Sequence, residues 1–207
     1  MSVSVIKQSI DSITLEVQIK FSRSMLDAEQ EIQDQLNQAG VIATESLLKT
    51  FDTDGSAITF GNVKMTSMGL VSKHYQTPYG ETTVERHVYQ TANGGSTYCP
   101  LEQNARIIIA STPRFASQIS YKMAEMSAVK VTEDLELNHG RKIANNVVQR
   151  VAEAVAAVVQ IKEESWSYTA PNIEDKEIST VSVGLDGTCM LMCEGSYRQA
   201  MVGTITL

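Results

Sequence analysis

The chain has few cysteines and no long apolar run. Its three cysteines, Cys99, Cys189 and Cys193, are spaced unlike a disulfide scaffold or a zinc ribbon, so we expect free thiols. No apolar run approaches the roughly 20 residues that cross a bilayer. The first residues also lack the basic and apolar regions of an export signal. These absences favour a cytoplasmic protein over a membrane-spanning or disulfide-rich secreted one.

Positive charge is also scarce. The chain has 17 basic and 24 acidic side chains, which gives a net charge of −7. Proteins that bind nucleic acid usually present a basic surface to phosphates, so this excess argues at first against them. The charge is uneven, however. Residues 61–160 hold 10 basic and 8 acidic side chains, whereas residues 1–60 hold 4 and 9 and residues 161–207 hold 3 and 7. Any contact with nucleic acid is therefore expected in the middle of the chain.

The first part of the chain, residues 1–110, predicts a mixed α and β region. Residues 13–21 alternate apolar and polar side chains with period two, which indicates a half-buried strand. Residues 24–51 change to a helical spacing, and Gly40 predicts a break between two helices.

Short strands separated by turn residues then indicate a small β-meander over residues 57–101. Its turns are expected at residues 78–80 and 93–95, where proline, asparagine and glycine gather. His74 and His87 lie on these strands, and we assign them no chemistry because single histidines on strands are usually structural.

Residues 111–165 are predicted to be helical. Thr112 followed by Pro113 is typical of a helix start, and apolar residues then recur at helical spacing. A second helix is expected over residues 129–137. A turn ending at Gly140 separates it from a long helix over residues 141–164.

One stripe of the long helix follows a heptad spacing over two repeats, and it consists of Ala144, Val148, Val151, Val155 and Val158. Such a seam predicts a homo-oligomer through the helix of residues 141–164. The same seam fits a protein-interaction module that does not bind DNA.

The helix, turn and long helix of residues 129–164 form a candidate DNA-binding unit. Arginine and lysine can reach guanine O6 and N7, and carboxamides can pair with adenine in the major groove. The expected DNA-binding residues lie near the start of the long helix, and they are Arg141, Lys142, Asn145, Asn146, Gln149 and Arg150. An ordinary helical hairpin with a solvated face explains the same pattern.

The C-terminal part is predicted to be a linker, residues 166–177, followed by a three-stranded antiparallel sheet over residues 178–207. Asp186 is expected at the end of the first of these strands. An aspartate in that position suits the first ligand of a two-metal nuclease site. The alternative is that Asp186 and Gly187 form the corner of a hairpin.

Several blocks resemble the ISKra-type family of insertion-sequence transposases, which are DDE enzymes, and they appear in the family's order. The blocks are TYCPLEQNARI (97–107), STPRFASQISYKMAEMSA (111–128), EDLELNHGRKIANNVVQRVAEAV (133–155), KEESWSY (162–168), VSVGLDGTCMLM (181–192) and YRQAMVGTITL (197–207). Residues 1–95 resemble the family only loosely.

The resemblance implies an α+β protein with a helix-turn-helix over residues 129–164 and the start of an RNase H-like domain over residues 178–207. It makes Asp186 the first catalytic acidic residue and a ligand of Mg²⁺. The second aspartate and the glutamate of the family have no counterpart in these 207 residues. We therefore expect a truncated bacterial transposase that binds insertion-sequence ends near the nucleoid, holds no Mg²⁺ tightly and does not cut DNA alone. The alternative is a competitor of an intact transposase.

Overall fold

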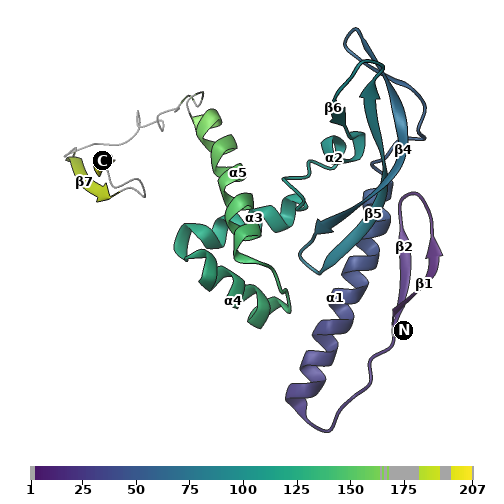
Figure 1. Cartoon of the computed structure of the whole chain (residues 1–207). Coiled ribbons are helices and arrows are strands. Elements are labelled where there is room, and N and C mark those ends of the chain that lie inside the picture. The colour runs from purple at the N-terminus through teal and green to yellow at the C-terminus, as the bar shows by residue number, and fades with distance from the viewer. Residues whose placement is uncertain (1–2, 164, 166, 168–181, 192–196, 207) are drawn as a thin grey trace, which may run out of the picture. The chain divides into compact units, whose positions relative to one another are not determined.

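The chain divides into two compact units, Met1–Ser165 and Trp166–Leu207. The structure is a computed structural model, and it describes residues 3–163, 165, 167, 182–191 and 197–206 (Figure 1). The two regions expected over residues 1–110 and 111–165 belong to one unit. Helices and antiparallel sheets hold most of the described residues, so the mixed α+β class is confirmed. Most of the expected linker, residues 166–177, lies outside the described residues.

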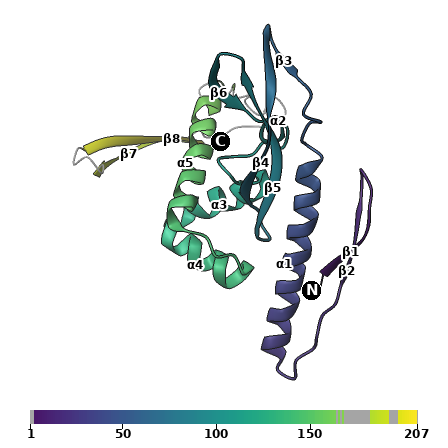
Figure 2. The ribbon, with the colours of Figure 1, turned by 45° about the vertical axis from the view of Figure 1, so that its right-hand side comes forward.

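The first unit begins with a two-stranded sheet that packs on a long helix (Figure 2). Strand β1 (Val3–Gln8) pairs antiparallel with β2 (Ile13–Val17). Half-buried and exposed residues alternate along β2, as its period-two pattern predicts, although the strand ends at Val17 and not at residue 21. The helix α1 (Met25–Lys49) starts at Ser24, whose side chain accepts a hydrogen bond from the N–H of Asp27.

The predicted break at Gly40 is wrong, because α1 is one continuous helix. Gly40 does not end the helix. Its lack of a side chain lets the Tyr79 ring pack closely on the helix. A Cβ at this position would lie 2.3 Å from Cγ of Tyr79, which is on the turn between two strands of the sheet. A helical glycine costs about 1 kcal/mol relative to alanine. Close packing of an aromatic ring on the helix backbone offsets that cost.

Four antiparallel strands form the sheet in the order β3 (Ile58–Phe60), β4 (Val63–Gln76), β5 (Glu81–Thr91) and β6 (Gly94–Tyr98). The predicted meander is therefore confirmed. The short helix α2 (Pro100–Asn104) follows β6. A core of four buried side chains joins α1, the sheet and α2, and it consists of Leu48, Tyr75, Val84 and Leu101.

Three further helices form a second core in the same unit. They are α3 (Pro113–Glu125), α4 (Ala128–His139) and α5 (Asn145–Glu163). The apolar stripe predicted after Pro113 is confirmed at Phe115 and Ile119, which are fully buried. Thr112 precedes the helix as expected, but its side chain makes no capping hydrogen bond. The remaining buried residues of this core are Ala116, Val131, Leu135, Val148 and Val151.

The turn between β4 and β5 connects the helices to the sheet. The Thr77 hydroxyl closes this turn, because it donates to the Gly80 carbonyl at 2.7 Å and accepts from two backbone N–H groups. Just before the turn, the N–H of Gln76 donates to the Ala110 carbonyl at 2.7 Å, and the N–H of Thr112 donates to the Gln76 carbonyl at 2.9 Å. The start of α3 is thus fixed to the end of β4.

Three strands are predicted over residues 178–207. The described residues of the second unit form two. Strand β7 (Ser182–Leu191) pairs antiparallel with β8 (Tyr197–Thr206). The pairing continues without a bulge through Asp186 and Gly187, opposite Val202 and Met201. Both readings of Asp186, a strand end and a hairpin corner, are therefore wrong, because the cross-strand pairing is not interrupted there. The RNase H-like assignment stays a prediction.

We expect Gly40→Ala to destabilise the first unit by about 1 to 3 kcal/mol, because the new methyl group overlaps the Tyr79 ring. In a Tyr79→Ala background the same change should stabilise it by about 0.5 to 1 kcal/mol, since only the helix propensity remains. Denaturant unfolding of the four proteins measures both effects. A Gly40→Ala effect that is equal in the two backgrounds contradicts this packing.

Candidate nucleic-acid interface

The corner between α4 and α5 is shaped by Gly140, whose φ of 62° lies in the left-handed region. The N–H of Gly140 donates to the Glu136 carbonyl, and the N–H of Arg141 donates to the Leu135 carbonyl. The first of these bonds, made by a left-handed Gly140, is the αL motif that ends α4. Residues 141–144 are not helical, so α5 begins at Asn145 and not at residue 141. Two helices joined by a turn are present, with a longer turn than predicted, and the assignment to a DNA-binding helix-turn-helix stays a prediction.

Arg141 does not belong to the exposed face, because the residue is only 6% exposed. Its Nε donates to the Thr77 carbonyl at 3.1 Å, and its Nη2 donates to Oε1 of Gln76 at 2.8 Å. The guanidinium also lies 5.3 Å from the centre of the Phe115 ring. Burial lowers the pKa of Arg141. As these bonds turn the guanidinium inward, we withdraw Arg141 from the proposed DNA face and assign it to the joint between the helices and the β4–β5 turn.

The other five predicted residues are all exposed. Asn146, Gln149 and Arg150 follow helical spacings of three and four, so they share one face of α5. Lys142 precedes the helix, and Asn145 is its first residue. The opposite side of the helix is fixed by Val148 and Val151, which are fully buried against α3 and α4. The first two turns of α5 therefore present a polar face on a rigid support.

Neighbouring side chains restrain part of this face. The Nζ atom of Lys142 lies 3.2 Å from Glu136, and both side chains are mostly exposed. Asn145 accepts a hydrogen bond from the Thr132 hydroxyl at 2.8 Å, which ties the first turn of α5 to α4. Gln149 donates to Glu153 at 2.9 Å. These exposed contacts contribute little to stability, so a ligand can replace them at low cost.

The valine seam lies partly in the core of the first unit. Val148 and Val151 are buried, and Val155 packs against the same core, so these positions are not free for a partner helix. Exposed apolar side chains occur further along α5, at Val158, Val159 and Ile161. Self-association through this helix stays a prediction, and it can involve only the last turns.

Asp186 lies in the middle of β7, in the second unit, and it is exposed. Its Oδ1 accepts a hydrogen bond from the N–H of Gly187 at 2.8 Å. Within the described residues, no three acidic, histidine or cysteine side chains gather as metal ligands would. One carboxylate does not make a two-metal site, so these residues by themselves do not fit the expected Mg²⁺. The catalytic and metal-binding roles of Asp186 stay predictions.

The polar cluster around Glu102 was not predicted from the sequence. Oε1 of Glu102 accepts hydrogen bonds from Lys73 at 2.7 Å, Tyr75 at 2.8 Å and Arg86 at 3.1 Å. Burial would raise the pKa of Glu102, but these three donors outweigh it and lower the pKa. Burial and the bond to Glu102 raise the pKa of Tyr75. The cluster joins α2 to two strands, and its two cations and one carboxylate are bonded to one another, so we interpret it as structural.

Asp52 and His87 form a second unpredicted pair. Oδ2 of Asp52 accepts from the backbone N–H of His87 at 2.9 Å and lies 3.0 Å from its Nδ1. A Cβ at Gly55 would lie 2.7 Å from Nε2 of the same ring. The imidazole is therefore packed on both sides, and the pair holds the loop after α1 against β5. No spacing in the sequence links residues 52 and 87.

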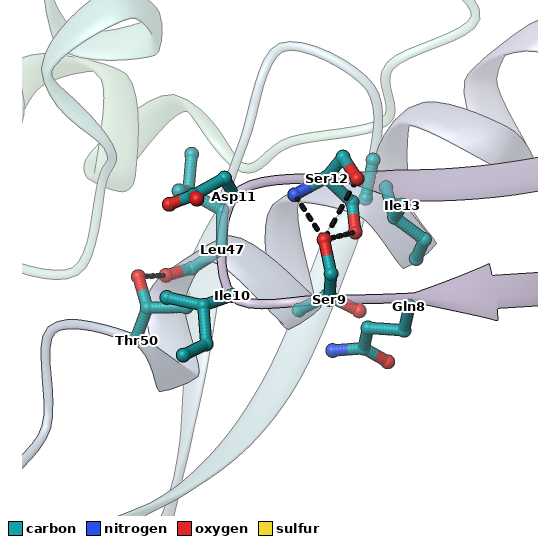
Figure 3. Close-up of a pocket in the computed structure, with 10 residues that line it drawn as sticks. Gln8, Ser9, Ile10, Asp11, Ser12, Ile13, Leu47 and Thr50 are labelled. Atoms are coloured by element: carbon teal, nitrogen blue, oxygen red, sulfur yellow. Dashed lines mark hydrogen bonds between the residues drawn. The ribbon is translucent and has the colours of Figure 1, made fainter.

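A cavity of about 250 Å³ lies between the β1–β2 turn and the end of α1 (Figure 3). Apolar side chains of Ile10, Ile13 and Leu47 line it, together with small hydroxyl groups. The hydroxyls of Ser9 and Ser12 lie 2.8 Å apart and close the turn. Asp11 is the single charged residue of the lining. This cavity has neither a catalytic pair nor a cation for a phosphate.

Comparison with known proteins leaves the family open, because no family model and no curated protein matches this chain. The resemblance to transposases therefore stays a hypothesis. No helix in the described part of the chain is long and apolar enough to span a bilayer.

We expect Arg141→Ala to lower the free energy of unfolding by about 2 to 3 kcal/mol, because the Thr77 carbonyl loses a charged donor in a buried place. Lys142→Ala is the matched control, and it should change stability by less than about 0.5 kcal/mol because Lys142 is exposed. Chemical denaturation of both variants tests the distinction. Equal effects would contradict the structural role of Arg141.

Proposed function

We propose that the first unit binds duplex DNA with the exposed face at the start of α5. One observation carries the proposal: Asn146, Gln149 and Arg150 are exposed together on the side of α5 opposite the buried Val148 and Val151. A buried side that fixes the helix and a polar side that is free to contact a ligand are what groove recognition requires.

The residue types suit the major groove. A guanidinium can donate two hydrogen bonds to O6 and N7 of guanine, and a carboxamide can pair with N6 and N7 of adenine. We assign base contacts to Arg150, Gln149 and Asn146, and a phosphate contact to Lys142, whose Nζ is bound to Glu136 only through an exposed ion pair. Asn145 lies between these groups and holds the helix start against α4.

The acidic charge of the chain limits the strength of binding. Lys142 and Arg150 are the two cations of the face, and Glu136 and Glu153 lie next to them. Few phosphates can therefore be neutralised, so we expect modest affinity that falls steeply as salt rises. Specific contacts to base edges must supply most of the discrimination between sequences.

We further propose that the chain is related to ISKra-type transposases and recognises insertion-sequence ends near the bacterial nucleoid. The sequence blocks named above support this, and the order α4, turn and α5 agrees with a helix-turn-helix region. On this proposal Asp186 is the first acidic residue of the triad, and Mg²⁺ binding belongs to an intact enzyme. Binding without cleavage would let the chain compete with an intact transposase for the same DNA.

The double variant Lys142→Ala, Arg150→Ala should bind DNA at least about tenfold more weakly than the parent, because it loses one base contact and one phosphate contact. Fluorescence anisotropy at low salt, with random and element-end duplexes, measures the affinity. If Lys142 touches a phosphate, the salt slope should also fall by about one.

The matched control is Lys20→Ala, Arg23→Ala, which changes the net charge equally at exposed positions between β2 and α1. It should bind DNA as the parent does. Circular dichroism verifies that all proteins are folded. Equal binding by the parent and the Lys142, Arg150 double variant would refute the proposed face, and equal losses in both double variants would show that only net charge matters.

We also expect the purified 207-residue chain to neither cleave nor join DNA with Mg²⁺ or Mn²⁺, because Asp186 supplies one carboxylate where two-metal chemistry needs several. Supercoiled plasmid and labelled element ends are the substrates. Metal-dependent nicking that disappears in Asp186→Asn would overturn this expectation, and Asp175→Asn controls for the loss of any one carboxylate.

A further inference from the structure

We propose that a crevice between α1, the β4–β5 turn, α3 and the end of α4 binds a phosphate group. Its volume is about 250 Å³, which is below the roughly 300 to 1,000 Å³ of pockets for drug-sized ligands. A small anion, or one group of a larger molecule, fits this size. No pattern in the sequence indicates this site, because its residues come from four distant segments.

Hydrogen-bond donors of several kinds line the crevice. They are one guanidinium, one imidazole, one phenol and three carboxamides, from Arg114, His139, Tyr79, Gln33, Asn37 and Gln118. None of the lining residues is acidic. A planar carboxylate can be satisfied by one arginine, whereas a tetrahedral phosphate has oxygens for donors on several sides. The lining therefore favours phosphate.

The guanidinium of Arg114 is available for such a ligand. Within the described residues it takes part in no ion pair or hydrogen bond, and Arg114 is exposed at the start of α3. Its neighbours in the crevice are fixed. Asn37 donates from Nδ2 to the His139 carbonyl at 2.9 Å and accepts from Gln33 at 3.2 Å. A charged donor thus stands beside a pre-formed polar wall.

Two carboxylates, Asp34 and Asp134, lie on helices that line the crevice, and both have other partners. Asp34 accepts a hydrogen bond from Gln30 at 3.0 Å. Asp134 forms an ion pair with Lys122 and a hydrogen bond with Asn138, and the Lys122 contact is the main reason that the pKa of Asp134 is lowered. Neither carboxylate is paired with Arg114.

Buried positive charge next to the crevice adds to its attraction for anions. Arg141 hydrogen-bonds to Thr77 and Gln76 and has no carboxylate among these partners. Thr77 is in the same turn as Tyr79, which lines the crevice. Glu81 is the carboxylate that acts on Arg141 through space, and it lies on the exposed start of β5.

Two measurements test the site with the full chain. Calorimetry in a chloride buffer of constant ionic strength, with inorganic phosphate as the probe, should show saturable binding. Anisotropy with a short DNA duplex tests whether the phosphate belongs to a polynucleotide backbone, and only this arm rests on the proposed function. Arg114→Gln should weaken phosphate binding about tenfold or more, since a charged donor is lost. The phosphate affinity of Arg114→Lys should lie between those of the parent and Arg114→Gln. The affinity of Arg23→Gln should equal that of the parent.

Loss of phosphate binding in Arg114→Gln, with DNA affinity unchanged, supports a site for free phosphate. A weaker DNA affinity in Arg114→Gln, with a salt slope lower by about one, supports a backbone phosphate. The site is refuted if Arg114→Gln changes neither measurement, or no more than Arg23→Gln does. A parent that binds phosphate but not DNA refutes the proposed function and leaves the crevice intact. A parent that shows no saturable phosphate binding, and whose DNA binding depends on Lys142 and Arg150 alone, refutes the crevice and leaves the proposed function intact.

Discussion

The first unit depends on the four-residue turn between β4 and β5, residues 77–80, because three parts of the chain meet there. The Thr77 hydroxyl fixes the shape of the turn from inside. On one side Tyr79 and Gly80 pack against α1, so closely that a Cβ at Gly80 would lie 2.3 Å from Val41. On the other side the Thr77 carbonyl accepts a hydrogen bond from Nε of Arg141. The position of α5, and so of its polar face, follows from these contacts.

Arg141 shows how a cation can be tolerated in such a joint. Removing a charge from water is costly unless hydrogen bonds replace the lost hydration. Two polar acceptors and the face of Phe115 supply that replacement, and the charge of Glu81 acts on the guanidinium from a distance. Because no carboxylate is hydrogen-bonded to it, the positive charge is not fully neutralised locally. The surrounding surface is thereby better suited to anions than the net charge of −7 suggests.

Local patterns in the sequence predicted the elements whose side chains interact with near neighbours. The meander, the start of α3 and the exposure of Lys142, Asn146 and Arg150 followed from turn residues and helical spacing. Gly40 and Arg141 could not be placed in this way, since a tyrosine and a threonine from a distant turn decide their roles. The strand through Asp186 was missed because aspartate and glycine usually form turns, whereas here pairing with β8 keeps them extended.

The turn also has a consequence for the order in which the first unit folds. The residues of the helical core lie between positions 115 and 151, so α3, α4 and α5 can meet over short stretches of chain. The bond from Asn37 to His139 spans 102 residues, and that from Arg141 to Thr77 spans 64. Closing such long loops is entropically expensive and slows folding. We therefore expect the helices and the hairpin to form as separate nuclei, and their joining at the turn to come late.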